Sequence, residues 1–86
     1  MNIKNISMWT LKEISESLQI PYEGDGSILI SGPSEPSTAS ADQIALALDS
    51  KFVPDLKNTK ARVALIAEGI NWKAIGLQGV LLVRAN

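Results

Sequence analysis

The sequence contains neither cysteine nor histidine, and each absence excludes a kind of chemistry. Without cysteine the chain has no disulfide bond, no thiolate nucleophile and no Cys-based metal site. Without histidine it lacks the usual general base and the commonest metal ligand. We therefore expect these 86 residues to hold no catalytic residue, no metal site and no cofactor.

A charge excess and a long apolar run are missing as well. Eight basic and nine acidic side chains give a net charge of −1, so no overall field attracts nucleic acid or an anionic membrane. No stretch approaches the roughly 18 apolar residues of a membrane span, and the N-terminus has no signal-peptide core. These observations predict a cytoplasmic protein that neither binds nucleic acid nor spans a membrane.

What remains is typical of one small globular domain. The chain has 86 residues, of which 45% are hydrophobic and 20% charged, a composition that folds as a single unit. Its first element is a helix that begins at a capping box, Thr10 to Glu13, in which each side chain accepts the other residue's backbone N–H. Pro21 disfavours helix at the residue before it, so this helix ends by about Gln19.

The next twenty residues are rich in turn formers. Tyr22 to Gly26 indicates a turn, Ile28 to Ile30 a short strand, and the proline- and serine-rich stretch from Gly32 to Ala41 a loop. The two glycines at Gly24 and Gly26 match no phosphate-binding pattern.

Three apolar runs then alternate with short helices. In Gln43 to Leu48, alanine and leucine favour helix, but the shortness of the run and the alternation of large and small side chains decide for a strand. Asp49 or Ser50 caps a short amphipathic helix that ends near Thr59. Val63 to Ile66 and Val80 to Val83 predict buried strands, with a short helix over residues 71–75. The sequence predicts an α/β fold, a small mixed sheet of about four to five strands flanked by short helices.

The segment from Gln43 also carries a family resemblance. The order Gln43, apolar, small, apolar, then Lys51-Phe52, then Leu56, Thr59 and Ala61, resembles the N-terminal domain of UDP-3-O-acylglucosamine N-acyltransferase, with its run similar to GQLSFLANPKY. The resemblance implies that residues 1–86 are the uridine-binding, non-repeat head of a longer enzyme, in shortened form. The catalytic β-helix of hexapeptide repeats is absent from this chain.

The resemblance also implies an activity for the intact enzyme. Such enzymes transfer a 3-hydroxyacyl chain from acyl carrier protein to the 2-amino group of UDP-3-O-acylglucosamine, in lipid A biosynthesis, and form homotrimers. This chain alone is expected to be monomeric and without acyltransferase activity.

From the family's uridine site, the resemblance implies three residues of this chain as candidates to bind uracil or UDP. In the family two aromatic rings enclose the uracil and an Asn reads its edge. Phe52 keeps one ring, Lys51 matches, and Asp49 stands at the Asn position, where a carboxylate only accepts hydrogen bonds. Leu46 stands at the other aromatic position and cannot stack.

Each candidate also has a purely structural interpretation. Phe52 can be a core residue one turn from Leu56, and Asp49 a helix cap. The basic residues Lys51, Lys57, Lys60 and Arg62 can contact a diphosphate or simply be solvated.

Two other functions stay open. One is a UDP-binding N-terminal domain similar to that of the peptidoglycan Mur ligases, although their Asp-Ser-Arg run is missing. The other is a non-catalytic interaction module whose uridine pocket has decayed, as Leu46 and Asp49 indicate.

Overall fold

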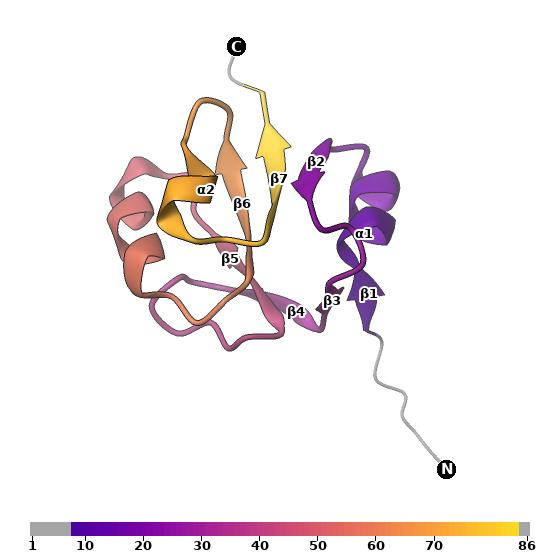
Figure 1. The fold of residues 1–86 in the computed structure, drawn as a ribbon, viewed down its shortest axis with the longest axis horizontal. Coiled ribbons are helices and arrows are strands. Elements are labelled where there is room, and N and C mark those ends of the chain that lie inside the picture. Colours follow the sequence, from indigo (N-terminus) through magenta and orange to yellow (C-terminus); the bar gives the residue numbers. More distant parts are fainter. Residues whose placement is uncertain (1–7, 85–86) are drawn as a thin grey trace.

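The computed structural model describes residues 8–84, which form a five-stranded mixed sheet, a two-stranded sheet and short helices around them (Figure 1). This arrangement confirms the predicted α/β class. In chain order the elements are β1 (Trp9–Thr10), α1 (Leu11–Leu18), β2 (Tyr22–Gly24), β3 (Leu29–Ile30), β4 (Gly32–Ser34), β5 (Gln43–Leu46), the 3₁₀ helix η1 (Ser50–Asn58), β6 (Val63–Ala67), α2 (Trp72–Ile75) and β7 (Gly79–Val83).

The larger sheet has the strand order β2-β7-β6-β5-β4. Strands β4, β5, β6 and β7 are parallel to one another, and β2 pairs antiparallel with β7 at one edge. The carboxyl ends of the parallel strands therefore lie along a common edge of the sheet. Open parallel sheets bind ligands outside this edge, so the residues that follow β5, β6 and β7 are well placed for function.

Helix α1 begins and ends as predicted. Thr10 Oγ1 accepts a hydrogen bond from the amide of Glu13 at 3.0 Å, and Glu13 Oε1 accepts one from the amide of Thr10 at 2.8 Å. The C-cap residue Gln19 has a left-handed backbone with φ of 58°, two residues before Pro21. The capping box is thus formed by both of its side chains.

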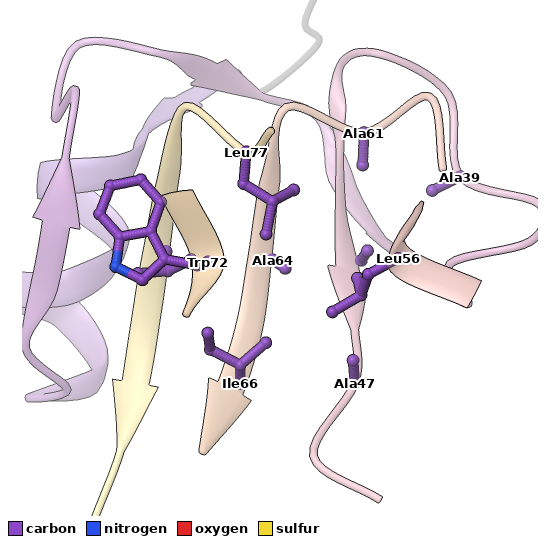
Figure 2. Close-up of a cluster of buried hydrophobic side chains, with 10 residues drawn as sticks. Ala39, Ala47, Leu56, Ala61, Ala64, Ile66, Trp72 and Leu77 are labelled. Carbon is purple, nitrogen blue, oxygen red and sulfur yellow. The ribbon is translucent and has the colours of Figure 1, made fainter. Parts of the chain in front are cut away.

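Strand side chains alternate between two separate cores, one on each face of the sheet. On the side that we call the η1 face, η1 and α2 cover the sheet. Leu56 points toward β6, whereas the Trp72 ring lies over β7 and points away from Ala64 and Ile66 (Figure 2), toward Glu23 of β2. On the other side, the α1 face, α1 and the small β1-β3 sheet cover part of the surface. The η1-face cluster is Ala39, Ala45, Ala47, Leu56, Ala61, Ala64, Ile66, Trp72, Leu77 and Val80; the α1-face cluster is Leu11, Ile28, Ile30, Ile44, Val63 and Leu81.

Two sequence predictions of non-strand structure are wrong. The predicted turn at Tyr22 to Gly26 contains β2, and the predicted loop from Gly32 contains β4. Both are three-residue edge strands whose pairing partners lie elsewhere in the chain. Pro33 is tolerated in β4 because an edge strand needs hydrogen bonds on one side only.

The helix after Asp49 is present with the expected bounds, but it is a 3₁₀ helix rather than a regular amphipathic α-helix. Pro54 lies inside it and cannot donate the hydrogen bond that an α-helix requires beyond its first turn. After the helix ends at Asn58, Thr59 Oγ1 accepts a hydrogen bond from the amide of Ala61 at 3.2 Å. This turn leads the chain into β6.

Across residues 8–84, none of the helices has the length and apolar character needed to cross a membrane.

Candidate functional site

The predicted ligand residues lie just beyond the carboxyl end of β5. The strand ends at Leu46, and the ladder is extended by one hydrogen bond, from the amide of Ala47 to the carbonyl of Leu65 at 2.9 Å. The chain then turns at Asp49 into η1, which carries Lys51 and Phe52 in its first turn. All three candidates therefore occupy the sheet edge at which open α/β sheets bind ligands.

Asp49 is the N-cap of η1, as its structural interpretation predicted. Its Oδ1 accepts the amide of Lys51 at 3.0 Å, and its carbonyl accepts the amide of Phe52 at 2.9 Å. A carboxylate offers about four lone-pair positions, and this cap uses one of them. Since Asp49 is exposed, its carboxylate can cap the helix and accept a ligand N–H at the same time.

Phe52 is half-buried and packs against the η1-face cluster, which includes Leu56. The ammonium of Lys51 lies 5.1 Å from the centre of the Phe52 ring. At an exposed position such a cation–π contact is worth about 0.5–1 kcal/mol, little enough for a ligand to displace the lysine. Phe52 therefore has the core contacts that its structural interpretation predicted, and it is only partly buried.

Leu46 packs in a different environment from Phe52. Ala45 and Ala47 face the η1 face, whereas Leu46 points to the α1 face, where it lines an open groove. A ligand that touches both Leu46 and Phe52 must therefore lie across the carboxyl end of β5. A hydrogen bond joins the amide of Lys51 to Asp49, and a cation–π contact joins the Lys51 ammonium to Phe52.

The four basic residues do not form one cluster. Lys51 lies at the carboxyl edge, but η1 runs back along the sheet to the start of β6. Arg62 directly precedes β6, and its Nε donates a hydrogen bond to the carbonyl of Ala41 at 3.1 Å. Arg62 thus stands at the opposite, amino edge of the sheet, and a diphosphate beside Asp49 is not within its reach.

Two charged residues at the carboxyl edge escaped the sequence analysis. Glu68 follows β6 and Arg84 follows β7, and Arg84 Nε lies 3.9 Å from Glu68 Oε2. Both side chains are exposed, so this ion pair adds at most about 1 kcal/mol to stability. The sequence did carry a signal for them: each directly follows an apolar run predicted to be a buried strand, and this position places it on the same edge of the sheet as Asp49.

An apolar groove lies on the α1 face. Its volume is about 320 Å³. One bank is formed by Trp9, Ile14 and Leu18, and the other by Pro33, Leu46 and Leu65. Trp9 and Ile14, which flank the helix cap, line the groove together. It was not predicted, because its two banks come from segments that are distant in the sequence.

Two carboxylates with altered acidity lie away from this edge. The hydroxyl and amide of Ser27 hydrogen-bond to Asp25 and lower the pKa of its carboxyl group. The hydroxyl of Ser40, 2.5 Å from Asp42 Oδ1, likewise lowers the pKa of Asp42. Both aspartates stand at the amino edge of the parallel strands. Among residues 8–84, no three carboxylate side chains gather closely enough to hold a metal ion.

Comparison with known proteins finds relatives over most of the chain. No family model matches the sequence. The UDP-3-O-acylglucosamine N-acyltransferase of Paracoccus denitrificans is 35% identical over 74 residues, which cover 86% of this chain and 20% of that protein. The enzyme of the same name from Ruegeria pomeroyi is 30% identical over 73 residues, 85% of this chain and 20% of that protein. The chain spans about a fifth of the length of the curated relatives that it matches.

Proposed function

We propose that this chain is the N-terminal UDP-sugar recognition domain of an acyltransferase that N-acylates UDP-3-O-(3-hydroxyacyl)glucosamine in lipid A biosynthesis. The observation that carries the proposal is the similarity of 85% or more of the chain to two proteins with this activity in their names. The position of Asp49, Lys51 and Phe52 at the carboxyl edge of the sheet supports it.

Each of the three residues has a defined part in the proposed site. Phe52 stacks against one face of the uracil. Asp49 accepts the imide N–H of the uracil while it continues to cap η1. Lys51 moves from the Phe52 ring to the diphosphate, exchanging a cation–π contact for a charge-assisted hydrogen bond.

The acyl transfer itself is assigned to residues outside this chain. Its 86 residues offer no histidine or cysteine, and it spans a fifth of the relatives' length. We expect acyl carrier protein and the trimer contacts to engage those other residues. The chain alone should then be monomeric by light scattering at micromolar concentration and should not turn over an acyl carrier protein thioester.

The test is a titration of the ¹⁵N-labelled chain with uridine diphosphate, followed by amide chemical shifts. We expect saturable shifts at the start of η1, and Phe52→Ala should weaken binding at least about fivefold, since stacking on an aromatic ring contributes about 1–3 kcal/mol per base. Lys57→Ala is the control for Lys51→Ala, because Lys57 lies at the far end of η1. Equal losses in the two lysine variants would contradict the assigned site.

A second candidate, a non-catalytic interaction module with a decayed pocket, is favoured by Leu46 and Asp49. Leu46 provides no stacking face, and the Asp49 carboxylate provides no donor. If uridine diphosphate causes no shift while the circular dichroism spectrum shows an intact fold, this second function takes precedence.

A further inference from the structure

Two lysines among residues 8–84 place their ammonium groups over aromatic rings. The ammonium of Lys51 lies 5.1 Å from the centre of the Phe52 ring, and that of Lys73 lies 5.6 Å from the centre of the Trp72 ring. Both distances are within the range of a cation–π attraction. The rings differ in their surroundings, because Trp72 is only 8% exposed whereas Phe52 is partly buried. A ligand ring can therefore compete with the lysine at Phe52 and has no room to do so at Trp72.

The Lys51 side chain is held at its base and exposed at its end. The amide of Lys51 donates to Asp49 Oδ1 at 3.0 Å, which fixes the backbone at the start of η1. The side chain is exposed, and no carboxylate of the described residues forms an ion pair with its ammonium. Because an exposed cation–π contact is weak, the ammonium leaves the ring when a stronger partner for its charge is present.

We infer that the contact of Lys51 with Phe52 is autoinhibitory and makes the site select nucleotides over nucleosides. The inference rests on the proposed function, which assigns the stacking of the base to Phe52. The ammonium lies over the ring at which the base would stack. A diphosphate attracts the ammonium through a charge-assisted hydrogen bond and so uncovers the ring. A nucleoside has no charged group and must displace the lysine without a compensating contact.

The test compares uridine with uridine diphosphate on the parent chain and on Lys51→Ala, by calorimetry. Uridine should bind the variant about two- to fivefold more tightly than the parent, because no cation–π contact competes with stacking. The ratio of the diphosphate affinity to the uridine affinity should fall at least about tenfold, because the charge-assisted hydrogen bond is lost. One substitution then changes the two affinities in opposite directions, whereas a loss of structure would weaken both.

Lys73→Ala is the matched control, because it removes the other cation–π contact and should leave both affinities unchanged. Proton NMR adds a direct measurement of the contact. In the parent chain without ligand, the current of the Phe52 ring should shift the ε-methylene protons of Lys51 upfield. Uridine diphosphate should return them toward the ordinary lysine position and leave those of Lys73 in place.

The possible failures have different signatures. If uridine diphosphate binds the parent but Lys51→Ala weakens uridine binding or leaves it unchanged, the proposed function stands and the inference alone is overturned. Ordinary ε-methylene shifts of Lys51 in the ligand-free parent would also overturn the inference, as would equal effects of Lys51→Ala and Lys73→Ala. If neither ligand binds the parent or the Lys51→Ala variant, the proposed function is wrong, and the inference fails with it.

Discussion

The two faces of the central sheet are built in opposite ways. On the η1 face the strands present mostly small side chains, and Ala45, Ala47 and Ala64 are fully buried. On the α1 face the same strands present larger side chains, yet Leu46 is 39% exposed and Leu18 of the covering helix 55% exposed. The face with the smaller side chains is the better covered.

Small side chains explain how the η1 face is closed. Alanines let η1 and α2 approach the sheet, and Leu56 and Trp72 fill the space between them (Figure 2). On the α1 face, an eight-residue helix is only about 12 Å long, and it leaves the β5 and β4 side of the sheet open. The η1 face is therefore the more fully closed of the two, and the α1 face keeps exposed apolar surface at Leu46 and Leu18.

The sharpest test of this comparison is a pair of truncations in neighbouring strands. Ile66→Ala on the η1 face should lower the free energy of unfolding by about 2–5 kcal/mol, because the side chain is fully buried and leaves a cavity. Leu46→Ala on the α1 face should cost under about 1 kcal/mol, since this side chain keeps much of its solvent contact. Urea denaturation measures both values.

Losses of similar size in the two variants would show that the α1 face is packed as tightly as the η1 face. The groove would then be closed in solution, and the contrast between the faces would be wrong.

A double variant tests whether one ligand contacts both faces of the sheet at the end of β5. Leu46→Phe together with Asp49→Asn restores a stacking ring on the α1 face and a hydrogen-bond donor beside Phe52. Stacking adds about 1–3 kcal/mol and the amide about 1 kcal/mol, so calorimetry should show uridine diphosphate binding at least tenfold tighter. Because asparagine caps helices as well as aspartate does, η1 should remain intact.

The control for this double variant combines Asp49→Asn with Leu29→Phe, which adds a ring to the small sheet instead. If neither double variant binds uridine diphosphate measurably, while circular dichroism shows an unchanged fold, the proposed uridine site is wrong. The non-catalytic interaction module with a decayed pocket is then the favoured function.

The sequence predicted those features of the fold that depend on residues close together in the chain, and it missed those that depend on distant residues. The capping box at Thr10, the Asp49 cap and the apolar runs of β6 and β7 each depend on residues close together in the chain, and all are present. Strands β2 and β4 were missed because their structure depends on pairing with distant partners.

The candidate site was predicted less completely, for a related reason. Sequence order places Asp49, Lys51 and Phe52 next to one another, and the structure brings them into contact. The separation of Arg62 from Lys51, and the approach of Glu68 to Arg84, follow from the strand order of the sheet. The spacing of residues along the sequence does not reveal the order of the strands in the sheet.

Weakening α1 tests how strongly one short helix holds the α1 face. Thr10→Ala removes the side chain that accepts the Glu13 amide and should cost about 1 kcal/mol, within the range of N-cap losses. Chemical shift changes should reach α1 and the groove residues and leave the η1 face unaffected. Thr38→Ala, at another exposed threonine hydroxyl that hydrogen-bonds to a side chain, is the control and should cost less. Shift changes spread evenly over both faces would mean that the two cores are not separate.

The smallest expected effect concerns Asp25, whose loop supports α1. The amide of Asp25 donates to the carbonyl of Gln78 at 3.0 Å, and the amide of Lys12 donates to the carbonyl of Gly26 at 3.0 Å. Hydrogen bonds from Ser27 hold the pKa of the Asp25 carboxyl below its ordinary value of 3.8. The stabilisation from these bonds is therefore fully present above about pH 3.8 and is lost as the pH falls through the lowered folded-state pKa.

Ser27→Ala removes the hydroxyl that contributes most to this shift, so the pKa of Asp25 should rise toward 3.8. Carbon-13 NMR titration of the carboxyl groups measures the change directly. Asp42 is the internal control, because its pKa is lowered chiefly by Ser40 and should not respond. If the α1 face depends on this loop, the variant should lose stability above pH 3.8 and resemble the parent chain at lower pH, with the Trp9 indole signal responding and the Trp72 signal unchanged. A pKa of Asp25 that stays the same in the variant would show that the Ser27 hydroxyl does not hold the loop, and the attachment of α1 would then rest on its backbone hydrogen bonds alone.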